Sequence, residues 1–271
     1  LENQNNERQK ATKKAQDDAK AQIGEDSDLN LITAFFKVPD EEESESTQKD
    51  YLPGEEIYAG IVGLVAAKLT EYYYRPAIAG IVEKDTCRAS CRSIPEFHIT
   101  EALDECSDLL VRHGGHAMAA GFTVKLENLP EFLKRINEIA DRELGQQELR
   151  QMVKVDCEVP VDQITPGIYK ELEQLQPTGM SNPSALFMAK GVRFSDMKVM
   201  GKDGIHLRAS IEGCVINQAV AFNQADWFDV WRQRNPKFDI VYSIEINRYF
   251  EKETQQINIR DMRLTEESGT K

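Results

Sequence analysis

"AGIVGLVAAKLTEYYYRPAIAGIVEKDTCRASCRS", residues 59–93, places a helix and two strands in succession, and this order decides the fold class. In residues 59–73 the apolar side chains recur at helical spacing, which predicts a helix. Residues 75–83 form a short apolar run typical of a buried strand. Residues 86–93 alternate small and polar side chains, which predicts a second strand.

The flanking sequence continues the same alternation. Residues 1–23 predict a polar helix, residues 29–38 a strand, residues 121–126 a strand and residues 128–144 an amphipathic helix. We also expect a helix over 101–113, capped by Thr100 and closed by Gly114 at its C-terminus. Strands that alternate with helices indicate an α/β domain, here a mixed sheet flanked by helices.

The sequence pattern changes near residue 150, from alternating strands and helices to successive strands. Strand-like segments follow one another, at residues 151–161, 185–194, 206–212, 214–222, 238–250 and 254–264. Two short helices interrupt them, at 167–175 and 224–233. Five or so strands with few helices predict an OB-like β-barrel, a fold that commonly binds oligonucleotides. We therefore expect a connecting helix (1–24), an α/β domain (25–148), an OB-like barrel domain (150–265) and a tail (266–271).

Composition limits the functional classes. The 271 residues carry a net charge of −13, which argues against a protein that coats nucleic acid but allows a local basic groove. No signal peptide or membrane-spanning run is visible, and the five cysteines suit a reducing, cytoplasmic setting. Because the chain lacks an initiator Met and opens within a predicted helix, we expect it to be part of a longer protein.

The sequence offers no pattern for a metal or hydrolytic centre. Cys87 and Cys91 lie four apart, with Cys106, His113 and His116 downstream, but this spacing matches no standard zinc pattern, and buried thiols explain it as well. We find no Asp-His-His cluster, no HExxH and no phosphate-binding GxxxxGK[ST]. We therefore expect neither a catalytic residue nor a metal ligand in this chain.

Two motifs suit an anion. Gly114 and Gly115 leave the backbone bare beside His116, and a helical turn beginning after His116 would offer free N–H groups to a phosphate. The alternative is a glycine helix stop with a packed histidine. Upstream, Ser90, Arg92 and Ser93 place hydroxyls and a guanidinium at a strand end, where Ser90 and Arg92 share a face with Arg88. The alternative is an edge strand with a solvated arginine.

A third candidate lies in the predicted barrel. A basic patch is expected from Arg193, Lys198, Lys202, His206 and Arg208. Phe187, Phe194 and Phe222 lie near enough in sequence to offer stacking faces, or else belong to the core. A hairpin turn with solvated charges is the alternative for the patch.

Together, "SCRSIPEF", "ALDECSDLLVRHGGHAMAAGFTV", "LQPTGMSNPSALF" and "VMGKDGIHLR" resemble, in order and spacing, the C-terminal part of the RecJ family of single-strand-specific DNA exonucleases. The resemblance covers almost the whole chain. It implies a DHH-associated substrate-binding domain, an OB domain and a helix that joins them to a catalytic DHH domain outside this sequence. Relatives of this kind hydrolyse single-stranded DNA from the 5′ end with Mn²⁺ or Mg²⁺ in repair and recombination.

The resemblance also implies residue roles and partners. In the family the S-x-R and GGH motifs face the metal site and hold the DNA end with its phosphates, and these roles fall on Ser90, Arg92 and residues 114–116. Implied partners are single-stranded DNA and, with it, single-strand-binding or other repair proteins. The chain departs from the family at Tyr58, Cys91, Thr178 and Ser181 and in the acidic segment 39–50, which indicates a divergent member.

Three hypotheses follow. The chain is the substrate-binding portion of a RecJ-like 5′→3′ exonuclease, inactive on its own. Alternatively it is a non-catalytic nucleic-acid or protein-binding scaffold, which the acidity and Tyr58 favour. A third possibility is a small-substrate phosphodiesterase or an alanyl-tRNA-editing relative, against which the barrel argues. The sequence indicates neither a preference for DNA or RNA nor an oligomeric state.

Overall fold

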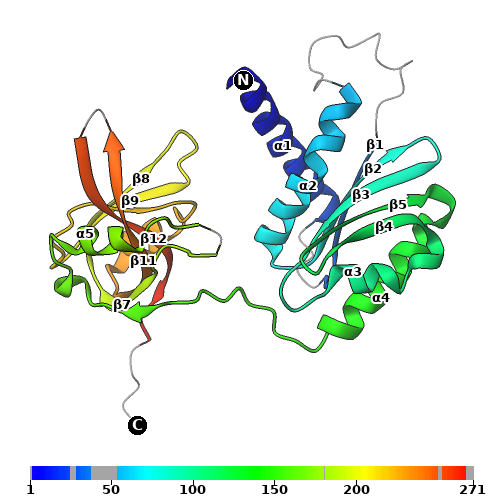
Figure 1. Ribbon diagram of the computed structural model, residues 1–271. Coiled ribbons are helices and arrows are strands. Elements are labelled where there is room, and N and C mark those ends of the chain that lie inside the picture. The colour runs from blue at the N-terminus through cyan, green and yellow to red at the C-terminus, as the bar shows by residue number, and fades with distance from the viewer. Residues whose placement is uncertain (1, 25–28, 38–53, 180, 250–251, 267–271) are drawn as a thin grey trace. The chain divides into compact units, whose positions relative to one another are not determined.

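The computed structural model describes residues 2–24, 29–37, 54–179, 181–249 and 252–266. The chain divides into two compact units, Leu1–Gln151 and Met152–Lys271 (Figure 1). The acidic segment 39–50 lies outside the described residues, as does the side chain of Tyr58. No helix in the described part is long and apolar enough to cross a membrane.

The first unit is a mixed sheet between helices. Its elements are α1 (Glu2–Ile23), β1 (Ile32–Lys37), α2 (Gly54–Tyr73), β2 (Ala77–Glu83), β3 (Thr86–Arg92), α3 (Ile99–Asp104), β4 (Leu110–His116), β5 (Ala119–Lys125) and α4 (Leu129–Leu144). The strands lie in the order β1-β2-β3-β5-β4, and only β1 and β2 run parallel. The predicted α/β class is confirmed.

Helices cover the two faces of this sheet unequally. On one face α4 buries Phe132, Ile136 and Ile139 against a core that takes side chains from β2, β3 and β5. On the other face α1 and α2 cover β1 and β2, and the described core there holds no residue of β4 or β5. The polar helix α1 packs through small side chains, with Ala11 and Ala15 buried one turn apart. On this face α2 also borders β3, and β5 and β4 stay outside the described core.

The helix predicted over 101–113 is wrong. α3 ends at Asp104, a short 3₁₀ turn follows, and residues 110–116 form the strand β4. The apolar spacing fits a helix, but pairing of β4 with β5 satisfies most of the backbone of a segment that contains two glycines, which disfavour a helix. The cap is also different: the His98 ring accepts from the Glu101 amide at 3.2 Å, while the Thr100 hydroxyl donates to the His116 carbonyl at 2.8 Å.

The second unit is a seven-stranded sheet around one core. Its elements are β6 (Cys157–Glu158), α5 (Ile168–Leu172), β7 (Phe187–Val192), β8 (Phe194–Met200), β9 (His206–Ile211), β10 (Ala219–Ala221), α6 (Trp227–Arg234), β11 (Phe238–Tyr249) and β12 (Lys252–Leu264). The strand order is β6-β7-β11-β12-β10-β9-β8. Of the strand expected over 151–161 only β6 forms, and the sequence pattern missed β8, because the strand predicted there ends at residue 194.

The sheet curls so that distant strands meet inside it. Phe194 lies on the edge strand β8, and its ring centroid is 5.4 Å from that of Phe238 on β11, although three strands separate β8 from β11 in the sheet. The ring centroid of Trp227 on α6 lies 5.7 Å from that of Phe238, so this helix covers the same core. Such curling around an apolar interior is the OB-like architecture that the sequence predicts, and it is confirmed.

Candidate nucleic-acid interface

The sheet face of the first unit that α2 borders collects the predicted side chains in rows. Arg92 on β3 pairs with Ala119 on β5, and Ala119 pairs in turn with His116 on β4. Directly paired residues of antiparallel strands point to the same face, with Cβ atoms about 5 Å apart. Arg92 and His116 therefore flank one small side chain.

The neighbouring row is nearly bare. Ser90 on β3 pairs with Gly121 on β5, which pairs with Gly114 on β4. Because side chains alternate along a strand, this row shares its face with the row of Arg92. The intervening Cys91 points into the core on the other face and is fully buried. Of the predicted set, the sheet thus brings together Ser90, Arg92, Gly114 and His116.

Gly114 and Gly115 are glycines for different structural reasons. A Cβ built on Gly115 would lie 2.4 Å from the Ala119 oxygen and 2.4 Å from the Ala120 Cα, so glycine is required there for β4 to approach β5. A Cβ on Gly114 would meet nothing within 4 Å in the described structure. Packing inside the unit explains Gly115, whereas Gly114 leaves the backbone open to whatever approaches from outside.

Helix α2 forms the border of this face. A Cβ on Gly63 would lie 3.2 Å from Nη2 of Arg92, so the small residue makes room for the guanidinium. Nη1 of Arg92 donates to the Cys91 carbonyl at 2.8 Å, which leaves the remaining donors for a ligand. The helix therefore packs against the β3 end of both rows, where Ser90 and Arg92 are half-buried, and the glycine lets the guanidinium fit beneath it.

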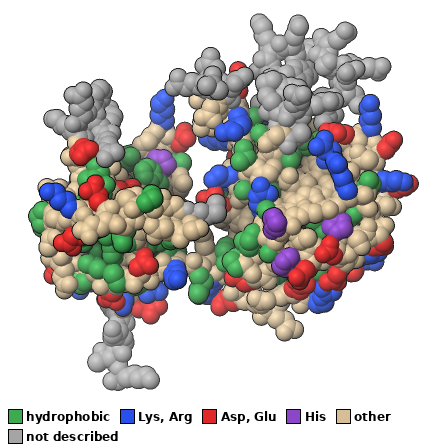
Figure 2. Space-filling view, viewed as in Figure 1, with side chains coloured by type: hydrophobic (Ala, Val, Ile, Leu, Met, Phe, Trp, Pro, Cys, Tyr) green, Lys and Arg blue, Asp and Glu red, His purple; other side chains and the backbone are tan. Residues whose placement is uncertain are grey.

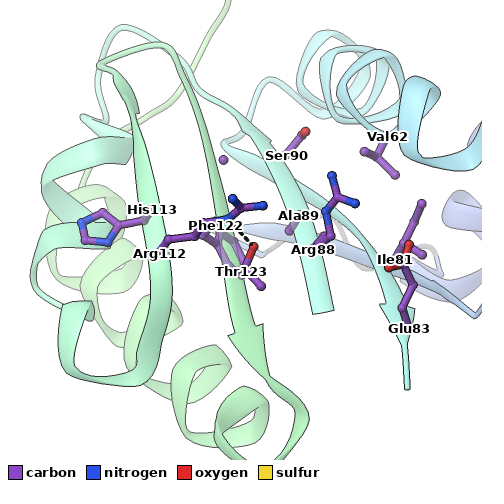
Figure 3. Close-up of a pocket in the computed structure, with 11 residues that line it drawn as sticks. Val62, Ile81, Glu83, Arg88, Ala89, Ser90, Arg112, His113, Phe122 and Thr123 are labelled. Carbon is purple, nitrogen blue, oxygen red and sulfur yellow. Dashed lines mark hydrogen bonds between the residues drawn. The ribbon is translucent and has the colours of Figure 1, made fainter. Parts of the chain in front are cut away.

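A groove of about 250 Å³ lies at the other end of the same rows (Figure 3). Its lining includes Arg88, Ser90, Arg112, Gly121 and Thr123, with Val62 and Ile81 on the side of α2 and β2. Figure 3 shows the Arg112 side chain reaching across β5 and the His113 ring pointing away from the groove. The His113 Nε2 lies 2.7 Å from Oδ1 of Asp104.

The charge pattern of this face differs from that of the rest of the unit. Arg135 pairs with Asp108, and Arg142 pairs with Glu105 at 2.7 Å. Within the described residues no ion pair is found for Arg88, Arg92 or Arg112. Figure 2 shows Lys, Arg and His side chains around an area that is mostly backbone and uncharged atoms. In a chain of net charge −13, arginines that have no carboxylate partner among the described residues suit the binding of an anion.

Three expectations for this region need correction. Ser93 does not join the group, because it is buried and its hydroxyl donates to the Phe97 carbonyl at 2.6 Å. Gly114 closes no helix, and no helix begins after His116: a two-residue turn leads directly into β5. A phosphate would therefore meet side chains and an edge strand instead of a helix N-terminus.

The cysteines near this face are structural. Burial raises the pKa of Cys87 to about 12 and that of Cys106 to about 11, and it raises the pKa of Cys91 as well. A thiol must lose its proton to bind a metal or attack a substrate, so burial disfavours both. Among the described residues no three His, Cys, Asp or Glu side chains gather as metal ligands would.

The second unit contains part of the predicted basic patch. Lys198 on β8 pairs with Arg208 on β9, and both side chains are exposed on the outer face of the sheet. One row further, His206 lies beside Phe222, with ring centroids 5.3 Å apart, and Phe222 is 46% exposed. Phe187 and Phe194 belong to the core.

Other members of the patch form hydrogen bonds or ion pairs within the second unit. The Arg193 guanidinium donates to the Asn235 carbonyl at 2.7 Å, and Lys198 pairs with Asp196 at 3.2 Å. Lys202 lies in the turn between β8 and β9 and belongs to neither paired strand. Of the patch, Arg208 stays on the exposed outer face, and His206, whose Nδ1 accepts from the Asn223 amide at 3.0 Å, lies against one exposed aromatic ring.

Sequence reasoning missed Arg112, Thr123 and Gly63. The alternation that placed Arg88 beside Ser90 was visible in the sequence. Arg112 was assigned to a helix, and Thr123 to a strand whose partners were unknown. Only the pairing of β4 with β5 brings them to this face.

Two domain families match the chain. The DHHA1 domain matches residues 45–142, and the RecJ OB domain matches residues 155–261. The single-stranded-DNA-specific exonuclease RecJ of Bacillus subtilis is 35% identical over 211 residues, and that of Escherichia coli is 28% identical over 227 residues. These matches cover 76% and 78% of this chain but only 27% and 38% of the relatives, so the chain spans between a quarter and two fifths of their length.

Solved structures show the same fold. RecJ from Thermus thermophilus in complex with Mn²⁺ superimposes with a TM-score of 0.73 at 23% identity, over 97% of this chain and 35% of that one. The same protein in complex with Mg²⁺ gives a TM-score of 0.69 at 21% identity, over 95% of this chain and 36% of that one.

Proposed function

Because the chain consists of a DHHA1 domain and a RecJ OB domain homologous to the C-terminal portion of RecJ exonucleases, we propose that it binds the substrate for a RecJ-like 5′→3′ single-stranded DNA exonuclease. It holds the DNA end and its phosphates in repair and recombination. Hydrolysis belongs to a DHH domain of the whole enzyme. A cytoplasmic location and repair-protein partners stay predictions.

The row of Arg92 and His116 carries this proposal. A guanidinium presents two parallel donors that match two phosphate oxygens, and an imidazole adds a further donor across the small Ala119. The Ser90 hydroxyl adds another donor, and Gly114 lets the phosphate approach the backbone. The row therefore suits a terminal phosphate, which carries more negative charge than an internal one.

The described residues do not form a metal site. The Thermus thermophilus relatives hold Mn²⁺ and Mg²⁺, but no group of three metal-ligating side chains occurs in the described part of this chain. We therefore derive no metal-dependent step from its residues. The role that these residues can perform is to bind and position the strand.

The second unit adds a sequence-independent contact. Bases stack on exposed aromatic rings, each stacked base contributing about 1–3 kcal/mol, and nearby cations attract the strand. Phe222, which lies beside the His206 ring, supplies the exposed aromatic surface on the outer face of the OB domain, and Arg208 on the paired strand supplies the cation. We propose that a base of a single strand stacks there.

A salt-controlled titration tests the end clamp. The probe is a single-stranded oligonucleotide with a fluorophore at its 3′ end, with or without a 5′ phosphate, and binding is followed by anisotropy. Removing a charge-assisted hydrogen bond worth about 1.5–3 kcal/mol predicts at least a tenfold weaker binding of the phosphorylated probe to Arg92→Gln. The variant should also show no preference for the 5′ phosphate, and His116→Ala should weaken binding in the same direction.

A control and two further arms sharpen this test. Lys134→Gln removes one charge from α4, which packs on the opposite sheet face, and should bind like the parent. An RNA probe of the same sequence tests the preference for DNA, and a dinucleotide tests the small-substrate alternative. Unchanged affinity of both Arg92→Gln and His116→Ala would overturn the proposal.

The net charge of −13 favours the scaffold alternative. Joining the chain to a DHH domain and assaying nuclease activity with Mn²⁺ separates the two. Activity that depends on Arg92 excludes a role as scaffold alone.

A further inference from the structure

Arg88 and Arg112 form a pair of cations on the same sheet face, in a row separate from that of Arg92 and His116. Arg88 on β3 and Arg112 on β4 both pair with Thr123 on β5, so they flank this residue as Arg92 and His116 flank Ala119. Nε of Arg112 donates to the Thr123 hydroxyl at 3.3 Å, which orients the guanidinium over β5. Both arginines are exposed, and both line the groove.

A β-bulge puts Arg112 in this position. Leu110 pairs with Val124 and packs on the core side, and the register then shifts before Arg112. In a regular strand residues two apart share a face, so Arg112 would follow Leu110 into the core. The extra residue, Val111, reverses this and turns Arg112 outward.

The groove around the two arginines suits a strand backbone. Ser90 and Gly121 of the bare row line it, with Gly114 next to Gly121 in that row, and Val62 and Ile81 form an apolar wall. Glu83 lines the far end, beyond Arg88. Two guanidinium groups without acidic partners in the described structure attract an anion between them, and the Glu83 carboxylate repels one further on.

The two cationic rows are too far apart to share one phosphate. Four residues separate Arg88 from Arg92 along β3, which is roughly 13 Å at about 3.3 Å per residue. At the rise of ~3.4 Å per nucleotide of a stacked strand, this distance spans about four nucleotides, and fewer in an extended strand.

We propose that Arg88, Arg112 and Thr123 form a second phosphate subsite, which binds an internal phosphate of the single strand whose end lies at Arg92 and His116. This inference rests on the proposed function and extends it. The strand then runs along β3, β5 and β4, over the bare middle row, instead of leaving the sheet after its terminal phosphate.

A length series tests this subsite separately from the end clamp. The probes are 5′-phosphorylated oligothymidylates of one, two, four and eight nucleotides, which compete with a labelled strand for the full chain at fixed salt. Arg88→Gln and Arg112→Gln should each bind the eight-nucleotide probe about five- to tenfold more weakly and the mononucleotide like the parent. Because each variant removes one cation that neutralises a phosphate, the slope of log affinity against log salt should fall by about 0.7 in each.

Arg92→Gln and Lys134→Gln complete the design. Arg92→Gln should weaken binding of every probe, including the mononucleotide, and Lys134→Gln none. If Arg92→Gln weakens binding while the Arg88 and Arg112 variants match the parent at every length, the second subsite is wrong and the end clamp stands. Equal weakening at every length for Arg88→Gln and Arg112→Gln also overturns the subsite, because both rows would then bind one phosphate. Unchanged binding by Arg92→Gln refutes the end clamp itself.

Discussion

Gly114 and Gly115 are neighbours in sequence, and the structure predicts opposite outcomes when each gains a side chain. In Gly115→Ala the new Cβ would lie 2.4 Å from backbone atoms of β5, which cannot move away as a flexible side chain can. Overpacking of this kind costs about 1–3 kcal/mol. For a unit of this size, each kcal/mol corresponds to about 2–4 °C in melting temperature, so we expect a fall of roughly 2–12 °C.

Gly114→Val should fold at least as well as the parent. Its Cβ meets nothing within 4 Å in the described structure, and replacing a strand glycine removes a backbone entropy cost of about 0.5–1 kcal/mol. The same side chain would stand on the open face, in the row of Ser90 and Gly121 that the ligand is proposed to cover. We therefore expect an unchanged or higher melting temperature together with about tenfold weaker binding of 5′-phosphorylated single strands, a difference of ~1.4 kcal/mol.

Two measurements decide this: calorimetric or circular-dichroism melting, and the anisotropy titration with the phosphorylated probe. Gly114→Val that binds like the parent would mean that no ligand approaches this row. Gly115→Ala that melts like the parent would mean that β4 and β5 pair in another register. Either result would refute the assignment of the two glycines to different roles.

Three further predictions follow from burial and charge. Burial raises the pKa of Cys106 to about 11 and that of Cys87 to about 12. The neutral thiols therefore contribute their full stability below the unfolded-state pKa of about 8.5, and this contribution is lost as pH rises through 11–12. Alkylation at pH 8 should modify the exposed Cys157 first, and early modification of Cys106 would contradict this. Phe222→Ala should bind single strands about tenfold more weakly while Phe222→Trp keeps the affinity, and equal affinities would refute stacking. Glu83→Gln should strengthen binding of long strands a few-fold at low salt and less at high salt, and unchanged binding would place the strand away from the groove.

The sequence predicted the elements whose periodicity matches their burial. β2 is buried on both faces and reads as an apolar run, while β3 alternates, with Cys87 and Ala89 inward and Arg88 outward. In such strands the order of apolar and polar residues matches the order of buried and exposed side chains, so the sequence predicts both the strand and the face to which each side chain points. Ser90 and Arg92 were placed on one face in this way, and the structure places them so.

The segment 101–116 could not be read in this way. Leu103, Cys106 and Leu110 repeat at helical spacing, and all three do contact one core. They reach it from a helix, a turn and a strand in succession, because pairing with β5 outweighs local propensity. A core pattern shows which residues are inside, but different backbone paths can produce it. Gly114 and His116 therefore lie on a strand instead of at a helix end, and their predicted role in binding stays a prediction.

Arg112 shows the limit most clearly, because its direction depends on one unpaired residue. Alternation counted from Leu110 would put Arg112 in the core, where an unpaired guanidinium carries a large desolvation cost. The bulge at Val111 lets Leu110 pack inward and Arg112 point outward within three residues. Bulges are set by the partner strand, and a single sequence does not state which strand that is. The most specific feature proposed for this face, the pairing of Arg112 with Arg88 across β5, thus follows from the register of the sheet and not from the composition of any one segment.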